Sequence, residues 1–256
     1  MSLALITLSA EGLRTARRLR EHLPGCSLHA HRSVEALEAE PFDRIVDLTR
    51  ELWTDCRGLV YFAPTGAVVR IIAPLVTSKL TDPAVVVCDV WGRWALSLLS
   101  GHEGGANDLS LAVSNALGAE PIITTTTEAV KDLIVGVGCR KGASSESIEA
   151  AIRDALEGEG LALDRVRLLA SADLKAQEPG LLEAARRLDL PLRLLPSEEI
   201  RFAPLSFSPS EVAQRQVDLP GVAEPAALLA GRRTRLVLPR TVLHGLTVAI
   251  AQEIHA

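Results

Sequence analysis

The chain has 256 residues, of which 48% are hydrophobic and only 3% aromatic, and its formal net charge is −5. These values argue against the basic surface of a nucleic-acid binder, and the length allows one large or two small domains. A core of leucine, valine, isoleucine and alanine is typical of layered α/β proteins, in which buried parallel strands are aliphatic runs.

Targeting signals and cysteine pairs are not evident in the sequence. The apolar run Leu3–Leu8 lacks a basic flank and is too short for a signal peptide. No stretch reaches the roughly 18 to 20 apolar residues that a membrane helix needs. We therefore expect a cytoplasmic protein with no membrane partner. Reduced thiols are expected rather than a disulfide or zinc framework, because the cysteines are scattered. They are Cys26, Cys56, Cys88 and Cys139.

The first half of the chain alternates aliphatic runs, which predict strands, with amphipathic runs, which predict helices. A turn at Trp91-Gly92 predicts a hairpin between two of the strands. The helical periodicity of Leu109–Leu117 predicts a helix with Asn107 or Asp108 as N-cap and Gly118 as C-cap. The expected strands are Leu3–Leu8, Arg44–Leu48, Gly58–Phe62, Ala84–Asp89, Trp94–Leu99 and Pro121–Thr125.

The second half repeats the alternation. Pro179 predicts a helix start, the segment Ser208–Glu211 predicts a capping box, and Glu224-Pro225 predicts another helix with proline at its first position. Alternation of this kind predicts an α/β fold made of two small three-layer domains with largely parallel sheets, residues 1–130 and 131–256. The expected strands are Leu133–Val137, Val166–Ala170, Leu236–Pro239 and Leu246–Ala251, and one helix carries Ile148, Ala151, Ile152, Ala155 and Leu156.

A glycine-rich loop, Ser100–Asn107, lies between an expected strand and an expected helix. Its three glycines allow the backbone to approach a ligand, and the free amides of the following helix favour an anion. We expect the loop at the carboxyl ends of the strands, where open α/β sheets bind ligands. His102 is a candidate general base. The alternative is a tight loop with a solvated histidine.

A second loop, Gly136–Gly142, also joins a strand to a helix. It matches neither the dinucleotide pattern nor a P-loop. Arg140 and Lys141 can still pair with carboxylates, and Cys139 can be an activated nucleophile, although an inert buried cysteine is the commoner alternative.

Two further pairs of side chains have candidate roles. Lys175 and Glu178 follow a strand and can donate and accept protons, unless they form only a surface ion pair. His29 and His31 share one face of a strand, but no third metal ligand is nearby, so we expect no metal site.

Three stretches of the first half resemble the N-terminal region of cobalt-precorrin-5A hydrolases, the CbiG family. They are Pro64–Leu75 with Lys79, Asp82–Val87, and Leu98–Asn107. The second half is similar to the C-terminal domain of the same family in Gly136–Gly142, Leu174–Gly180 and Gly221–Leu228.

The resemblance departs from the family pattern at two places. Family members carry a middle segment that is nearly absent here between Thr127 and Gly136. Glu103 stands where an apolar residue is expected.

The resemblance implies a reaction on a cobalt-bound tetrapyrrole, in which water opens a δ-lactone and acetaldehyde leaves. It implies no cofactor beyond the cobalt that the substrate carries. His102 is the expected water-activating base, with Lys175 and Glu178 as further catalytic candidates in a cleft between the two halves. The expected substrate-binding residues are Thr65, Gly66, Arg70, Lys79, Gly101, Gly104, Gly105, Asn107, Thr124, Thr125, Gly138, Cys139, Arg140 and Glu224.

Other functions stay open at this point. A protein without the middle segment can instead bind and hand on corrinoid intermediates without catalysis. An unrelated nucleotide-binding domain is a third option, against which the missing phosphate motifs argue. Neighbouring cobalamin-pathway enzymes are conceivable partners, and the oligomeric state, including a homodimer, is open. Cobalt ligation by His102, His244 or Cys139 is also open.

Overall fold

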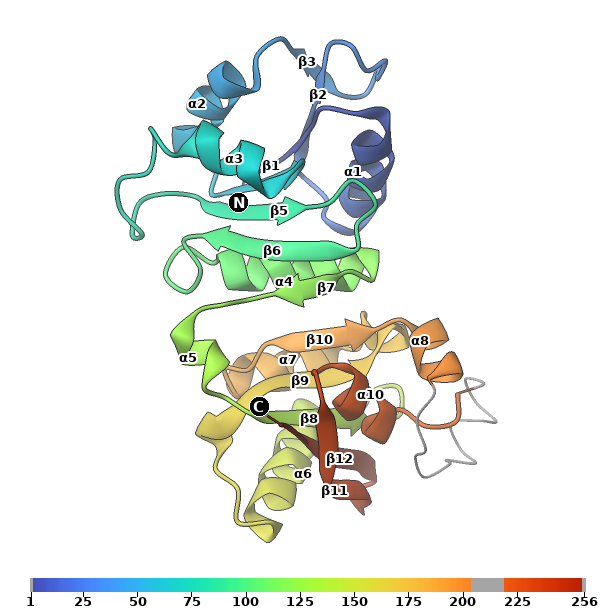
Figure 1. Cartoon of the computed structure of the whole chain (residues 1–256). Coiled ribbons are helices and arrows are strands. Elements are labelled where there is room, and N and C mark those ends of the chain that lie inside the picture. Colours follow the sequence, from blue (N-terminus) through green and yellow to red (C-terminus); the bar gives the residue numbers. More distant parts are fainter. Residues whose placement is uncertain (1, 204–218, 255–256) are drawn as a thin grey trace. The chain divides into compact units, whose positions relative to one another are not determined.

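The computed structural model describes residues 2–203 and 219–254. The chain divides into two compact units, Met1–Thr125 (unit 1) and Thr126–Ala256 (unit 2), which Figure 1 shows in blue to green and in green to red. The sequence analysis placed the boundary at residue 130. The expected capping box at Ser208–Glu211 lies outside the described residues.

Unit 1 contains a seven-stranded sheet in the order β3-β2-β1-β4-β5-β6-β7. The five strands from β3 to β5 are parallel, β6 runs antiparallel to β5, and β7 is parallel to β6. Two strand directions therefore meet between β5 and β6. The strands are β1 (Leu3–Thr7), β2 (Ser27–His31), β3 (Glu40–Phe42), β4 (Gly58–Phe62), β5 (Ala84–Cys88), β6 (Trp94–Leu99) and β7 (Glu120–Ile122).

Two helices cover each face of this sheet. Helices α1 (Ala10–His22) and α4 (Ala106–Leu117) pack on the face that carries Leu5 and Val86. Helices α2 (Ile45–Asp55) and α3 (Thr65–Ile72) pack on the opposite face with Tyr61. Consecutive residues of a strand point to opposite faces, so the aliphatic strands supply both cores.

Unit 2 contains a five-stranded sheet in the order β10-β9-β8-β12-β11. Strands β8, β9 and β10 are parallel, whereas β12 is antiparallel to both β8 and β11. The sheet is therefore mixed, with its parallel part at one side. The strands are β8 (Leu133–Gly138), β9 (Val166–Ala172), β10 (Leu192–Leu195), β11 (Thr234–Leu243) and β12 (Leu246–Glu253).

Helices again flank both faces in unit 2. Helices α6 (Ser145–Gly158) and α7 (Pro179–Arg187) pack on one face, and α8 (Ser197–Phe202) and α10 (Ala223–Leu229) on the other. The short helix α5 (Thr126–Ala129) opens the unit, and 3-10 turns precede and follow β9 at Leu163–Arg165 and Asp173–Lys175. The expected three-layer α/β architecture with mostly parallel strands is confirmed in both units.

Several local predictions were wrong. The expected strand Arg44–Leu48 is the start of α2, in which the buried Leu48 faces the sheet at helical spacing. A short apolar run does not by itself distinguish a strand from a helix. Pro225 is the third residue of α10 rather than the first, since the helix begins at Ala223. Strand β7 ends at Ile122, so the expected strand Pro121–Thr125 is mostly loop.

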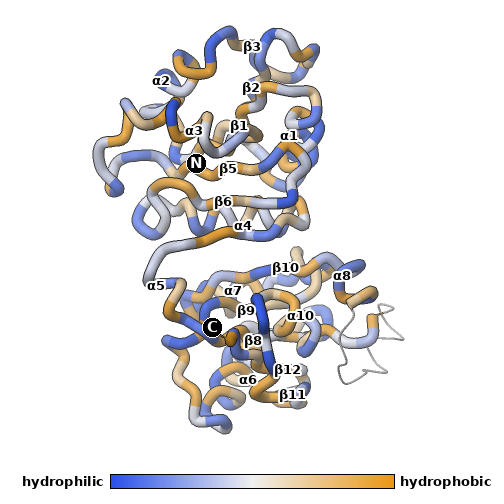
Figure 2. Tube along the Cα trace, in the orientation of Figure 1, coloured by the Kyte–Doolittle hydropathy of each residue, from blue (hydrophilic) through white to orange (hydrophobic). Residues whose placement is uncertain are grey.

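Figure 2 shows hydrophobic residues along the central strands of both sheets and hydrophilic residues on many outer helices and loops. Among the described residues, no helix combines the length and the apolar character needed to cross a membrane.

Candidate functional site

The glycine-rich loop of unit 1 lies at an edge of the sheet that the sequence did not predict. Because β6 is antiparallel to β5, Leu99 stands opposite Val85 at the beginning of β5. The loop that follows Leu99 is therefore at the amino ends of β1, β4 and β5 and at the carboxyl ends of β6 and β7. The loop was expected at the carboxyl ends of the strands, which holds for β6 and β7 but not for the parallel strands β1, β4 and β5.

Asn107 holds this loop together from inside α4. Its side chain is 8% exposed, its Oδ1 accepts a hydrogen bond from Ser97 at 2.8 Å, and its Nδ2 donates to Thr125 Oγ1 at 3.0 Å. The expected N-cap role was wrong, because Gly105 is the N-cap, at a φ of 84°. The amide instead joins Thr125, in the loop after β7, to Ser97 of β6.

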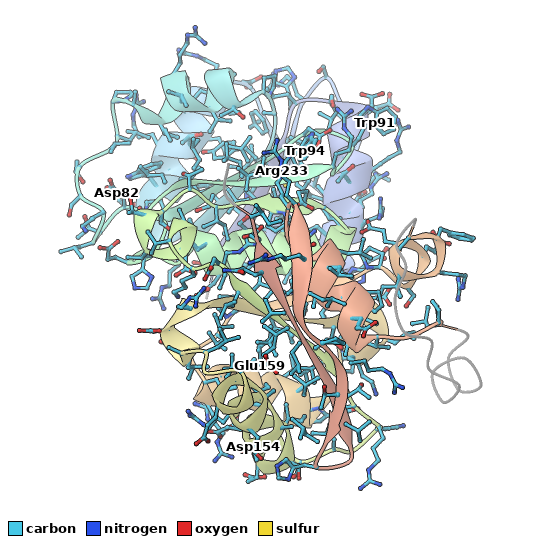
Figure 3. All side chains as sticks on the ribbon, turned by 60° about the horizontal axis from the view of Figure 1, so that its bottom comes forward. Asp82, Trp91, Trp94, Asp154, Glu159 and Arg233 are labelled. Carbon is cyan, nitrogen blue, oxygen red and sulfur yellow. The ribbon has the colours of Figure 1, made fainter. Side chains whose placement is uncertain are left out.

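Asp82 orders the loop that carries Lys79. This buried carboxylate accepts hydrogen bonds from the Thr77 amide at 2.8 Å, the Thr77 hydroxyl at 2.8 Å and the Ser78 amide at 3.0 Å. Burial pushes the pKa of Asp82 up, but these bonds and one from Trp53 outweigh it and hold the pKa below its ordinary value. Figure 3 labels Asp82 near the margin of unit 1.

The loop that carries Lys79 and the glycine-rich loop of unit 1 contact each other through charged side chains. Lys79 pairs with Glu103, and both side chains are exposed. The hydrogen bond from Lys79 lowers the pKa of Glu103, and His102 adds a smaller effect of the same sign. Lys79, Glu103 and His102 therefore gather on exposed loops at one edge of unit 1.

Ser100 is strained at the start of the glycine-rich loop. It has a φ of 59°, and its hydroxyl is buried without a hydrogen-bond partner in the described part of the chain. A Cβ on Gly104 would lie 2.3 Å from the Ser100 Cβ, and a Cβ on Gly101 would lie 2.7 Å from the Thr125 methyl group. The tight turn thus requires glycine at two positions where a binding role was expected.

Thr65, Gly66 and Arg70 lie apart from His102. Helix α3 begins at Thr65 after the carboxyl end of β4, which is the opposite edge of the sheet. The five residues of β5 separate these edges by about 16 Å. The Arg70 guanidinium donates back to the Gly66 carbonyl at 2.9 Å. The structure therefore does not bring these three residues into the cluster around His102. Thr124 is exposed between β7 and α5.

In unit 2, the candidate residues gather at the carboxyl ends of β8 and β9. Glu178 is 6% exposed, and its Oε1 accepts a hydrogen bond from the Gly142 amide at 2.8 Å. Its Oε2 lies 3.6 Å from Lys175 Nζ. Sequence reasoning placed Lys175 and Glu178 together correctly, but it did not predict that Gly142 is their third partner.

Cys139 belongs to the same cluster. Burial raises the pKa of its thiol, while the Lys175 charge lowers it and the Glu178 charge raises it by smaller amounts. Because the net pKa is above its ordinary value, the thiol is mostly protonated at neutral pH. This environment does not activate Cys139 as a nucleophile. Arg140 and Lys141 follow it on the exposed part of the loop.

Two other candidates make structural contacts. Gly138 pairs β8 with β12, where Thr247 Oγ1 donates to the Gly138 carbonyl at 3.0 Å. Glu224 is 2% exposed, and its Oε1 accepts a hydrogen bond from the Arg240 amide at 2.6 Å. Helix α10 lies on the sheet face opposite α6 and α7, so Glu224 anchors β11 from that face.

Three of the described histidines outside the glycine-rich loop make local contacts. His29 is buried beside Ser27 Oγ at 2.8 Å, and His31 packs its ring against Phe42. His244 Nε2 lies 2.7 Å from Asp154 Oδ2, on the helix where Figure 3 labels Asp154. Within residues 2–203 and 219–254, no three or more His, Cys, Asp or Glu side chains converge in a metal-binding group.

Sequence reasoning missed Asp82, Ser97 and Ser100. The run Thr77–Asp82 contains a signal for Asp82, because a carboxylate near serine and threonine can accept amide hydrogen bonds in a turn. The strain at Ser100 had no such signal, since serine rarely adopts positive φ.

Comparisons with known proteins cover both units. The family model "Cobalamin synthesis G N-terminal" matches residues 47–128, and the model "Cobalamin synthesis G C-terminus" matches residues 133–251. Together the two matches cover more than half of the chain. The chain belongs to the cobalamin synthesis G (CbiG) family. Only residues 129–132 separate the two matches in this CbiG chain, in agreement with a short form that lacks a middle segment.

Three curated relatives of this CbiG chain are informative. The cobalt-precorrin-5A hydrolase of Salmonella typhimurium is 44% identical over 50% of this chain, but the match spans only 36% of that protein. The cobalt-precorrin-5A hydrolase of Priestia megaterium is 25% identical over 80% of each chain. Protein CobE of a Sinorhizobium species is 36% identical over 49% of this chain and 83% of its own length.

Two solved structures are also similar. CobE, from the cobalamin biosynthetic pathway, is 35% identical over 48% of this chain and 90% of its own, with a TM-score of 0.44. A cobalamin biosynthesis protein G homologue from Sulfolobus solfataricus is 19% identical over 99% of this chain and 97% of its own, with a TM-score of 0.40.

Proposed function

We propose that this chain is a cobalt-precorrin-5A hydrolase. The observation that carries the proposal is that both halves match the two domain models of one family. A relative of that name matches over 80% of its own length. The substrate is a cobalt-bound tetrapyrrole rimmed by carboxylates, and the protein needs no cofactor of its own.

The proposed reaction has two bond-breaking steps. Water adds to the δ-lactone carbonyl, the acyl carbon–oxygen bond breaks, and a carboxylate and a hydroxyl group are freed. The hydroxyl then loses its proton to a base while the adjacent carbon–carbon bond breaks, and its carbon leaves as the carbonyl carbon of acetaldehyde. The electron pair of that bond stays on the cobalt macrocycle, which acts as the electron sink. The protein supplies a base for water and donors for the oxyanion.

Side chains on exposed loops support these roles. His102 is an exposed imidazole, and histidine is the side chain that most often serves as a general base in enzymes. Lys79, Arg140 and Lys175 are cations at loop positions, suited to the carboxylates of the substrate rim. Thr65, Gly66 and Arg70 can contact the substrate only from the other edge of unit 1.

The test is anaerobic incubation of the purified chain with cobalt-precorrin-5A, followed by assay of acetaldehyde and of the corrinoid mass. We expect acetaldehyde and the matching mass change. His102→Ala should lower turnover at least 100-fold, about the contribution of a general base. His22→Ala, which removes an exposed histidine of α1, is the matched control. Tight corrinoid binding without acetaldehyde would contradict the hydrolase and support a carrier.

A further inference from the structure

Glu178 stands at the N-cap of α7 but does not cap that helix. The N-cap side chain makes no hydrogen bond to the first turn of its own helix. It instead accepts the amide proton of Gly142, in the loop between β8 and α6, at 2.8 Å. A carboxylate that is 6% exposed needs such partners, because an unpaired buried charge is strongly unfavourable.

A second contact joins the same two loops. The Cα of Gly180 packs so closely on the Ala143 carbonyl that a Cβ on Gly180 would lie 1.9 Å from that oxygen. Gly142 has a φ of 75°, which glycine adopts without strain. The β8–α6 loop is thus fixed to the start of α7 by a charge-assisted hydrogen bond and by backbone packing.

Lys175 is the partly accessible member of the cluster. Its side chain is 18% exposed, compared with 6% for the Glu178 side chain. The distance of 3.6 Å from Nζ to Glu178 Oε2 is that of an ion pair rather than a hydrogen bond, so the ammonium has donors to offer a ligand.

We propose that Glu178 is a positioning residue and that Lys175 is the group that binds a carboxylate of the substrate. Glu178 holds the Gly142 loop through one oxygen and Lys175 through the other, and it does not itself transfer a proton. The assignment of the ligand as a substrate carboxylate rests on the proposed function. The positioning role rests on the contacts alone and is testable without substrate.

Cys139 is an internal reporter for the cluster, because its thiol responds to both charges. The experiment measures alkylation of Cys139 by iodoacetamide at pH 8, resolved from the other cysteines by peptide mass spectrometry. Glu178→Gln keeps an oxygen for Gly142 but removes the charge. It should speed alkylation, because the Glu178 charge raises the pKa of the Cys139 thiol, and Lys175→Gln should slow alkylation, because the Lys175 charge lowers that pKa.

Amide hydrogen exchange then separates geometry from charge. Glu178→Gln should leave the Gly142 amide protected, whereas Glu178→Ala should speed its exchange at least tenfold. Glu183→Gln, which neutralises an exposed glutamate of α7, should change neither readout. Unchanged Cys139 reactivity in Glu178→Gln, or a protected Gly142 amide in Glu178→Ala, would overturn the positioning role.

Kinetics with cobalt-precorrin-5A decides the division of roles. Lys175→Gln should raise KM at least tenfold, and Glu178→Gln should raise KM with kcat reduced no more than about threefold. Loss of kcat in Glu178→Gln at unchanged KM would identify Glu178 as a proton-transfer group and overturn the proposal. If the unsubstituted protein has no activity, the proposed function fails, while the alkylation and exchange results still decide the positioning role.

Discussion

The glycine-rich loops of the two units are fixed in different ways. In unit 1, the buried anchor of the loop is the neutral amide of Asn107, and the charged pair Lys79–Glu103 is exposed. In unit 2, the buried anchor is itself charged, because Glu178 holds the Gly142 amide and Lys175. Lys175 is therefore held in place by a buried carboxylate. Lys79 can instead separate from its exposed partner Glu103 at little cost in free energy.

The stability of each unit can be measured separately, because the tryptophans are confined to one of the two units. All three tryptophans, Trp53, Trp91 and Trp94, are in unit 1. Tryptophan fluorescence therefore follows unfolding of unit 1, and amide exchange of β9 follows unit 2.

The largest effect is expected from Gly180→Ala. The new Cβ would overlap the Ala143 carbonyl, so we expect a loss of about 3 kcal/mol in the stability of unit 2, seen in β9 amide exchange. Gly158→Ala is the control, since a Cβ there meets nothing within 4 Å. If the tryptophan transition shifts as far as β9 exchange, the two units do not unfold independently.

Asp82→Ala tests the anchor of the Lys79 loop. It removes the shared acceptor of the Thr77 and Ser78 amides and the Thr77 hydroxyl, so unit 1 should lose about 2 kcal/mol in urea denaturation followed by tryptophan fluorescence. Asp47→Ala, at an exposed site on α2, should have little effect. An unchanged midpoint for Asp82→Ala would show that the loop keeps its shape without this carboxylate.

Ser100→Gly should stabilise unit 1 by about 1 kcal/mol. Glycine relieves the positive φ and removes the unpartnered hydroxyl, and these gains exceed its larger entropy loss on folding. Ser100→Ala removes only the hydroxyl and should stabilise less. The same urea titration measures both variants, and a destabilised Ser100→Gly would mean that the hydroxyl has a partner in solution.

The smallest effect is a response to acid in unit 1. Burial lowers the pKa of His29 below its ordinary value of about 6.5, and Glu40 offsets this only in part. The unfolded chain therefore binds more protons at His29 than the folded chain does. The stabilisation that comes from the neutral His29 is complete above pH 6.5 and is lost as the pH falls through the pKa of His29 in the folded state. The urea midpoint of unit 1 should fall between pH 7 and 5, and less so in His29→Gln. If the urea midpoint falls equally with pH in His29→Gln and in the unsubstituted protein, His29 is not the cause.

The sequence predicted the fold well where the signal is a long aliphatic or periodic run. Strands such as Ala84–Cys88 and the face of α6 follow from their own residues. The helix at Ile45–Asp55 was mistaken for a strand, because the short apolar run at its start, Ile45–Leu48, does not by itself distinguish a strand from a helix. The pairing of Lys175 with Glu178 was also predictable, since the two residues are three positions apart.

The sequence by itself determined the two α/β units, the glycine-rich loops and the family, because these depend on local composition and residue order. Only the tertiary structure decided which edge each loop occupies. The Trp91-Gly92 turn correctly predicted the antiparallel hairpin of β5 and β6, but only the parallel pairing of β5 with β4 places His102 at the edge opposite Thr65, and that pairing is a long-range choice. The burial of Glu178 likewise depends on Gly142, 36 residues away, whose amide gives that charge its partner.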